Sequence, residues 1–271
     1  MTKHLRWPTV LYAATLAMTV SGCVARAGWQ YLPNPAAPAG KSLPVVLAVR
    51  TFKDDRPDAN HTYLWLCMLP LVPYCTADYD RPDSANGFLT MSAYDFRPAT
   101  DLANAAASEM RNSGLFRDVY VTDRSVEPEA QLMLRGVIHD TNWQGTRYAY
   151  MLGPYQGLLY ATGVPIGSVD DTLTLDLQLV EQANKRVLWT YTVNGESKIT
   201  ESYYKHFSDD FSYPQIFRDG MKGAVESLRA YVNSQPESFW SSMPYPTEPG
   251  LPAYPATAAD AADDAGAPTA H

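Results

Sequence analysis

The chain has 271 residues, with 21 lysine and arginine residues against 29 aspartate and glutamate residues, which gives a formal net charge of −8. This length is enough for one well-packed domain or two small ones. An acidic chain without a cluster of basic residues argues against nucleic acid as a partner, because nucleic-acid binding needs positive charge close to the phosphates.

Residues 1–22 have the layout of a secretory signal, with a short basic start followed by a mostly apolar run over residues 10–20. That run is too short to cross a bilayer, which takes about 20 apolar residues. The segment leads into Val20-Ser21-Gly22-Cys23, which resembles the lipobox of bacterial lipoproteins. The resemblance implies cleavage before Cys23 and transfer of diacylglycerol to its thiol. The alternative is an ordinary signal peptide with a chance cysteine.

Two or three acyl chains on Cys23 make a stable membrane anchor, since each buried methylene contributes about 0.8 kcal/mol. Val24 follows the cysteine. An aspartate there would indicate retention in the inner membrane of enteric bacteria, so Val24 favours the periplasmic face of the outer membrane. No later segment resembles a transmembrane helix, because Pro70 and Pro73 interrupt the densest apolar run, residues 63–74.

Two further cysteines, Cys67 and Cys75, are separated by seven residues. In an oxidising periplasm this spacing predicts a disulfide that closes an apolar loop. The alternative is a pair of unpaired thiols that pack as small hydrophobic side chains. The spacing fits no zinc motif and contains no Cys-x-x-Cys, so neither a metal site nor a redox site is predicted.

Composition divides the rest of the chain into three parts. Residues 23–42 are small and rich in proline, which predicts a flexible lipidated tether. Residues 43–235 form the expected domain. Residues 236–271 are rich in proline, alanine and aspartate, which predicts a disordered tail, so deletion of everything after Gln235 is expected to leave the fold intact.

Hydrophobic periodicity predicts the elements of the domain. Leucines at every second position from Leu173 to Leu179 predict a half-buried strand, and apolar residues at helical spacing from Phe217 to Tyr231 predict an amphipathic helix. The predicted strands are 44–52, 116–121, 130–139, 143–151, 173–179 and 187–193, and the predicted helices are 98–113 and 214–231, with a long insertion at 53–96 and a glycine-rich segment at 153–168. This order predicts an α+β fold, with two main helices packed on one face of a mixed, mostly antiparallel sheet.

Four of these segments, in order, are similar to a known group of periplasmic proteins. They are the strand Pro44–Phe52, the helix and strand over residues 102–120, the strand Ala130–Gly136, and the hairpin from Leu173 to Trp189. The order resembles lipoproteins related to the curli secretion channel subunit and the amino-terminal domain of TolB. The insertion at 53–96 departs from that family. The resemblance implies an envelope-assembly module that binds partners or forms rings, without catalysis.

Four polar clusters are candidate sites of chemistry. They are His139, Asp140 and Asn142; Ser168, Asp170 and Asp171; Asp54, Asp55 and Asp58; and His206, Asp209 and Asp210. None has the spacing of a catalytic elbow or of a calcium loop, and strand ends and turns explain each of them. No catalytic residue, metal or cofactor is predicted.

Exposed aromatic and apolar side chains are the more informative signal, because such residues are enriched at interfaces. The predicted partner-binding residues are Trp65, Leu69, Leu71, Tyr74, Tyr155 and Tyr160. The loop closed by the two cysteines is expected to be the main contact site. The alternative is that this loop tucks under the domain as a small satellite core.

Together these features predict a non-enzymatic outer-membrane lipoprotein, an envelope assembly, secretion or accessory module that binds another envelope protein or itself. Two alternatives are a periplasmic glycan or small-molecule binder that uses the aromatic residues, and an envelope hydrolase. A flat apolar patch would favour a protein partner. A cleft rimmed by aromatics and amides would favour the binder, and a buried histidine–carboxylate pair at a cleft would favour the enzyme.

Overall fold

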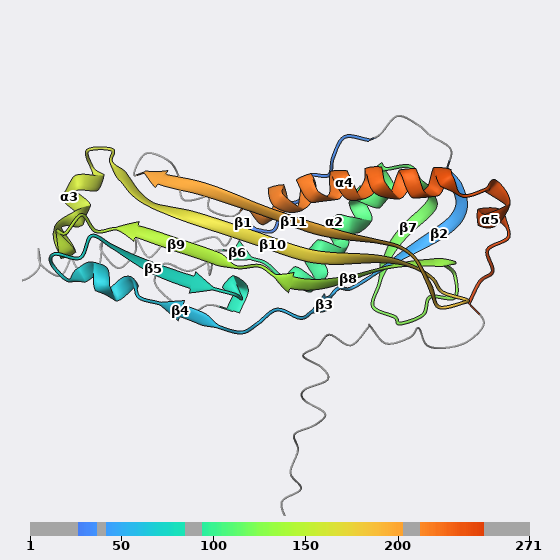
Figure 1. The fold of residues 1–271 in the computed structure, drawn as a ribbon, viewed down its shortest axis with the longest axis horizontal. Coiled ribbons are helices and arrows are strands. Elements are labelled where there is room, and N and C mark those ends of the chain that lie inside the picture. Colours follow the sequence, from blue (N-terminus) through green and yellow to red (C-terminus); the bar gives the residue numbers. More distant parts are fainter. Residues whose placement is uncertain (1–26, 37–41, 85–93, 203–211, 247–271) are drawn as a thin grey trace, which may run out of the picture.

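The computed structural model describes residues 27–36, 42–84, 94–202 and 212–246. They form an elongated α+β domain in which one long, twisted sheet carries two main helices on one face (Figure 1), as the sequence predicts. The predicted acylation site Cys23 and the cluster of His206, Asp209 and Asp210 lie outside the described residues.

The main sheet has the strand order β4-β5-β9-β10-β8-β2-β7, with β11 paired to β10 and β3 paired to β8. The pairs β2–β7, β2–β8 and β3–β8 are parallel and the remaining pairs are antiparallel, so the sheet is mixed. The strands are β2 (Leu43–Arg50), β3 (Lys53–Asp54), β4 (Asn60–Thr62), β5 (Tyr74–Tyr79), β7 (Phe116–Thr122), β8 (Leu132–Asp140), β9 (Trp143–Tyr148), β10 (Pro165–Glu181) and β11 (Arg186–Ser202).

The strand β10 joins the two halves of the sheet. It pairs with β11 along its whole length, while its other edge pairs first with β9 and then with β8. Its leucines from Leu173 to Leu179 are fully buried and the polar residues between them are half-exposed, which confirms the predicted alternation. The strand begins at Pro165, earlier than predicted, because the segment from Pro165 to Thr172 pairs with the far end of β11.

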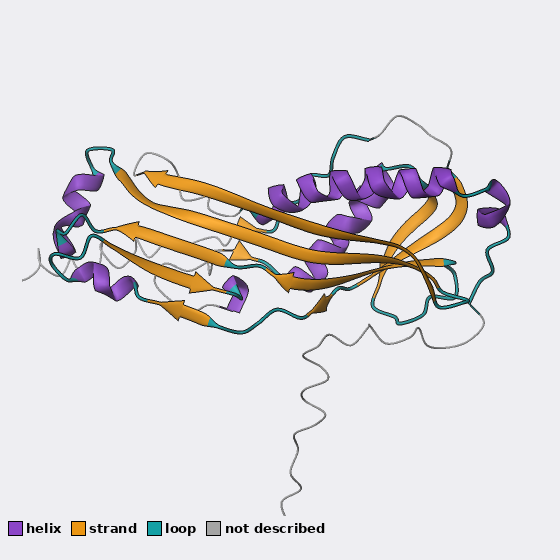
Figure 2. Cartoon of the chain, in the orientation of Figure 1, coloured by secondary structure: helices purple, strands orange, loops and turns teal. Residues whose placement is uncertain are grey.

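Helix α2 (Pro98–Asn112) packs on β7, β2 and β8, and helix α4 (Tyr213–Ser234) packs on β11 and β10, so that both helices cover the same half of the sheet (Figure 2). Helix α2 begins at a proline and is followed by Gly114 in the left-handed region, at φ +64°. Helix α4 buries Phe217, Met221 and Leu228 against the sheet, as its periodicity predicts. The opposite end of the sheet carries only short helical turns.

The predicted flexible tether is wrong for residues 29–34, which pack on the domain. Trp29 stacks on Phe96 with ring centroids 5.0 Å apart, and Tyr31 meets the edge of Phe217 at 5.7 Å. The buried carboxylate of Glu109 accepts hydrogen bonds from Tyr31 Oη at 2.6 Å and from the backbone N–H of Asn34 at 2.8 Å. A strand pair, β1 (Ala27–Gly28) with β6 (Tyr94–Asp95), precedes this segment.

The predicted insertion, residues 53–96, is not a loop in its described part. It supplies β3, β4 and β5, the short 3-10 helices η1 (Leu64–Met68) and η2 (Pro82–Ser84), and β6. The buried guanidinium of Arg56 anchors it, with Nη1 2.6 Å from Asp83 Oδ1 and 2.6 Å from Thr141 Oγ1, and with a paired contact to Asp54 at 2.8 Å. The glycine-rich segment likewise folds, as η4 (Gly153–Tyr155) and α3 (Gln156–Tyr160).

The boundary predicted after Gln235 is too early, because residues 236–246 continue the fold. Helix α5 (Glu237–Ser241) contacts β2 and places Trp240 in the core, where it is 2% exposed. Its ring lies edge-on to Phe239 at 4.9 Å, and Met243 is also buried. The prolines and serines around Trp240 and Met243 led to the prediction of a disordered tail.

Truncation after Gln235 is therefore expected to destabilise the domain by about 3–5 kcal/mol, the usual cost of removing a buried tryptophan. Thermal unfolding of this truncated chain and of a control that ends at Pro246 measures the effect. The control retains Trp240 and Met243 and is expected to keep the melting temperature of the full chain. Equal melting temperatures for the two truncations would contradict a structural role for α5.

Candidate functional site

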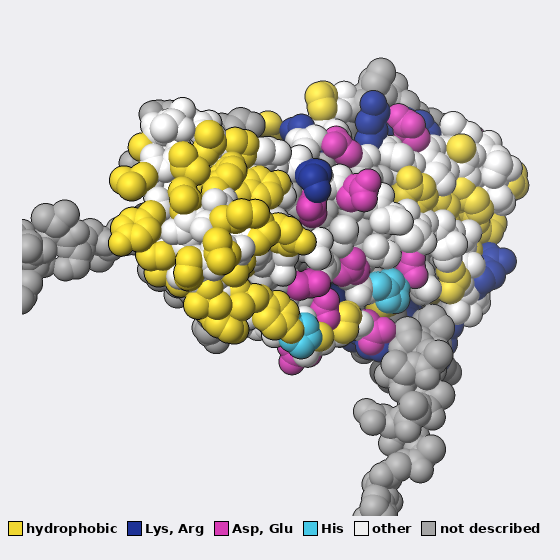
Figure 3. Space-filling view, turned by 60° about the vertical axis from the view of Figure 1, so that its left-hand side comes forward, with side chains coloured by type: hydrophobic (Ala, Val, Ile, Leu, Met, Phe, Trp, Pro, Cys, Tyr) yellow, Lys and Arg dark blue, Asp and Glu magenta, His cyan; other side chains and the backbone are white. Residues whose placement is uncertain are grey.

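Ten of the thirteen exposed large apolar side chains of the described residues gather at one end of the molecule, the end away from α5 (Figure 3). We name this group the distal surface. It consists of Tyr63, Trp65, Met68, Leu69, Leu71, Tyr74, Met151, Leu152, Tyr155 and Leu158, each between 38% and 80% exposed. Monomeric soluble proteins seldom leave so many large apolar side chains together in water.

Two segments far apart in the sequence build the distal surface, residues 63–74 and residues 150–160. The backbone joins them, because Leu71 N donates to Met151 O at 3.0 Å and Met151 N donates to Val72 O at 3.1 Å. Gly153 sits at φ +53° with the place of a Cβ only 3.0 Å from Met68 O, so a larger residue there would separate the segments. The two segments therefore form one continuous surface.

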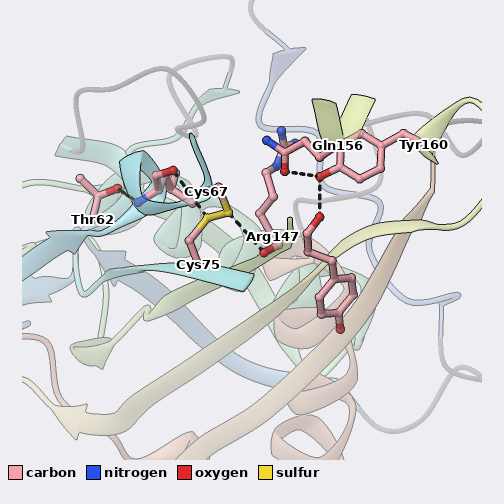
Figure 4. The surroundings of a disulfide bond; sticks show 8 residues. Thr62, Cys67, Cys75, Arg147, Gln156 and Tyr160 are labelled. Carbon is pink, nitrogen blue, oxygen red and sulfur yellow. Dashed lines mark hydrogen bonds between the residues drawn. A yellow bond between two sulfur atoms is a disulfide. The ribbon is translucent and has the colours of Figure 1, made fainter. Parts of the chain in front are cut away.

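A disulfide between Cys67 and Cys75 fixes the first segment, with Cα atoms 5.5 Å apart, as predicted (Figure 4). Both cysteines are buried against Ala149, with Leu64 and Leu66 beside them. The loop thus has an inner side that forms a satellite core and an outer side of exposed Trp65, Leu69 and Leu71, among others. The inner side agrees with the satellite-core interpretation of the loop, and the contact role of the outer side stays a prediction.

Five of the six predicted partner-binding residues lie exposed on the distal surface, and Tyr160 does not. Tyr160 is 7% exposed, and its hydroxyl donates to the carbonyl oxygen of Tyr148 at 2.6 Å and lies 2.8 Å from the side-chain amide of Gln156 (Figure 4). Burial of the ring raises the pKa of this hydroxyl. Tyr160 is the last residue of α3, and its buried hydroxyl connects that helix to the end of β9.

Backbone strain is concentrated in the same place. Among the described residues, four that are not glycine have positive φ, and three of them belong to this end: Leu71 at 69°, Tyr150 at 52° and Met151 at 63°. A left-handed conformation costs such residues about 1–3 kcal/mol each. The fold accepts this cost while leaving Leu71 and Met151 exposed, which makes this end a candidate functional site.

Charge is absent from both segments. No aspartate, glutamate, lysine or arginine occurs between Asp58 and Asp78 or between Arg147 and Asp170. The polar atoms that the distal surface offers to a partner are chiefly tyrosine hydroxyls and the indole N–H of Trp65. The surface is suited to apolar contact with a few hydrogen bonds at its aromatic side chains.

The polar groups elsewhere in the described chain do not form a reactive constellation. His139 Nε2 lies 3.0 Å from Asp176 Oδ2, but both side chains are half-exposed on the sheet. A cleft of about 370 Å³ between α2 and α4 is lined by Glu109 and Arg229, among others. Both side chains have partners within the protein, because Glu109 accepts a hydrogen bond from Asn34 N and Arg229 donates one to Ser113 O. No group of three or more histidine, cysteine or acidic side chains suited to a metal occurs in the described residues.

Comparison with known proteins finds no family model that matches the chain and no curated protein that matches it. A homologue of the neuraminyllactose-binding hemagglutinin from Helicobacter pylori is 11% identical, with 79% of this chain and 97% of that one covered and a TM-score of 0.37. A DUF330 protein from Xanthomonas campestris is 12% identical over 76% and 93% of the chains, with a TM-score of 0.36. Lipoprotein GNA1162 from Neisseria meningitidis is 12% identical over 69% and 99%, with a TM-score of 0.30. Within the described residues, no helix has the length and apolar character needed to span a membrane.

Asp171 is a buried acid on β10 whose raised pKa should make the stability of the fold depend on pH. Burial raises its pKa from 3.8 to about 7, against the opposing effect of the backbone N–H of Ser212, which donates to its Oδ2 at 2.9 Å. The folded state thus binds a proton that the unfolded state releases near pH 4. The stability contributed by the protonated form is present below pH 4 and is lost as the pH rises to about 7.

Replacement Asp171→Asn is expected to remove this loss and to keep an oxygen that accepts from Ser212. Relative to the wild type, the variant should gain up to about 1.4 kcal/mol per pH unit between pH 4 and pH 7 and nothing further above that. Urea unfolding at several pH values measures the difference. If the free energy of unfolding depends on pH in the same way in both proteins, the pKa of Asp171 is not raised in the folded state.

The double variant Cys67→Ala, Cys75→Ala tests the disulfide. Loss of a cross-link that closes a loop of this size is expected to lower the free energy of unfolding by about 2–3 kcal/mol. The structural effect is expected to stay local to the loop. Chymotrypsin should cut residues 63–74 faster in the variant, while β10 stays protected. Cutting of this segment at the same rate in both proteins would mean that the disulfide does not hold the distal surface.

Proposed function

We propose that the protein is a lipid-anchored, non-enzymatic binding module of the bacterial envelope, and that it binds through its distal surface. The observation that carries the proposal is the group of ten exposed apolar side chains at one end of the domain. Exposed surface of this kind disfavours a protein that acts alone in water, and it is typical of a docking site.

The anchor part of the proposal depends on the lipobox-like sequence that ends at Cys23. We place the chain at the periplasmic face of the outer membrane, because Val24 follows the cysteine and the Cys67–Cys75 disulfide suits an oxidising compartment. Acylation would hold the domain at a membrane surface, where a rigid apolar end meets other envelope components at high local concentration.

The geometry supports this function better than its two alternatives. A glycan or small-molecule binder would use aromatic side chains around a concave site, whereas Trp65, Tyr74 and Tyr155 project from an end of the domain. A hydrolase would need a carboxylate and a histidine held together out of water, whereas His139 and Asp176 are half-exposed.

Photo-crosslinking in cells tests the proposal. A photoreactive amino acid is introduced at Leu158 on the distal surface or, as a matched control, at Leu32 in the amino-terminal segment; both leucines are 73% exposed. The position at Leu158 is expected to give a specific adduct in the membrane fraction and the position at Leu32 is not. Adding Leu71→Asp should abolish the adduct, and adding Val187→Asp, at an exposed site off the distal surface, should leave it.

Absence of any adduct at Leu158, or equal adducts at Leu158 and Leu32, would contradict a binding role for the distal surface. Recovery of the chain in the soluble fraction after Cys23→Ser supports the anchor. Continued acyl labelling and membrane recovery of that variant would contradict it.

A further inference from the structure

We propose that the component bound by the distal surface is the lipid bilayer itself, with the aromatic and aliphatic side chains seated in its interfacial region. This inference rests on the proposed function and names the partner of the same site. The surface would be a second membrane contact beside the acyl chains on Cys23, so that the domain is oriented on the membrane as well as tied to it.

The composition of the distal surface is that of a bilayer contact. Protein interfaces of ordinary size are enriched in arginine and carry about one hydrogen bond per 100–200 Å². The two distal segments lie in stretches, between Asp58 and Asp78 and between Arg147 and Asp170, that contain no aspartate, glutamate, lysine or arginine. The polar atoms that remain belong to one tryptophan and three tyrosines, the residue types that concentrate at membrane–water interfaces.

Several backbone N–H groups of the distal surface are hydrogen-bonded within the protein and do not need water as a partner. A peptide N–H that leaves water must find a partner inside the protein. Several amides of the two segments have one: Leu69 N donates to Leu66 O at 2.9 Å, Leu71 N to Met151 O at 3.0 Å, Leu152 N to Ala149 O at 3.0 Å, and Tyr155 N to Leu152 O at 3.1 Å. Contact with lipid therefore leaves these groups satisfied.

Rigidity lowers the cost of this contact. The disulfide and the left-handed residues Leu71 and Met151 hold the apolar side chains outward before any partner arrives. Insertion then needs little ordering of the protein, which is the cost that usually weakens binding by loops.

The length of chain between the predicted anchor and the domain brings the surface to the membrane. Three residues separate Cys23 from Ala27, the start of β1, and an extended chain over these four residue steps spans at most about 14 Å. Strand β1 lies near the middle of the long axis of the domain (Figure 1). With that point held close to the bilayer, a tilt of the long axis brings the distal end into contact.

Quenching of Trp65 fluorescence by brominated lipid tests the inference. The chain, as the cell processes it, is reconstituted in vesicles of zwitterionic phosphatidylcholine with or without bromine on the acyl chains. Bromine quenches only indoles that enter the bilayer, and Trp65 is the most exposed tryptophan in the described residues, at 62%. The variant Trp65→Phe is expected to lose at least half of the quenching, and Leu158→Asp to reduce it by a similar factor, while Leu32→Asp leaves it unchanged.

Equal quenching in the wild type and in Trp65→Phe would overturn the bilayer as partner. If a protein or a second copy of this chain is then captured at Leu158 in cells, the proposed function stands and only its partner is corrected. If no adduct forms either, both the inference and the proposed function fail. Circular dichroism of each variant verifies that the fold is intact.

Discussion

The structure depends on the pairing of β10 with different neighbours along its length. A 17-residue strand is roughly 57 Å long, longer than the helices that cover it, and only one end of it, with β8, lies in the helix-covered half. Its other end pairs with β9 and thereby supports β5 and β4. Because β11 follows β10 over the whole distance, the distal part of the sheet extends from the core without a helical layer of its own, and the exposed apolar residues lie at its end.

This architecture separates the main core of the domain from the distal surface. Leu47, Leu175 and Phe217 are buried in the helix-covered core, which is the large hydrophobic cluster of the described residues. At the distal end the enclosed part is small and consists of the disulfide, Ala149 and two neighbouring leucines. A covalent bond replaces the missing core there, which allows the remaining apolar side chains to stay outside. A surface of this kind can tolerate change with little effect on the folding of the domain.

The sequence predicted those features whose signal is local. The alternation in β10, the helical stripe of α4 and the pair Cys67 and Cys75 each identify an element without reference to the rest of the chain. The elements that were missed depend on distant partners. Residues 29–34 have the composition of a linker, and their contacts with Glu109 and Phe217 become evident only in the folded structure. The burial of Trp240 likewise depends on the contact of α5 with the distant strand β2.

The sequence predicted only part of the distal surface. Trp65, Leu69 and Leu71 lie in an apolar run between prolines, whereas Met151 ends a predicted strand, residues 143–151, and Leu158 lies in the glycine-rich segment 153–168. Tyr160 could not be separated from its neighbours, because its burial depends on the carbonyl of Tyr148 across a turn. The shared absence of charge over both segments was the signal that would have joined them.

Hydroxyl-radical footprinting of methionine tests the central claim, that the distal surface is covered in the cell envelope. Met68 and Met151 are 58% and 56% exposed, and methionine oxidises readily when water reaches it. The account predicts that both are oxidised in the purified domain and protected in isolated membranes, while exposed Tyr245 is modified in both samples. Equal oxidation of Met68 and Met151 in the two samples would contradict it.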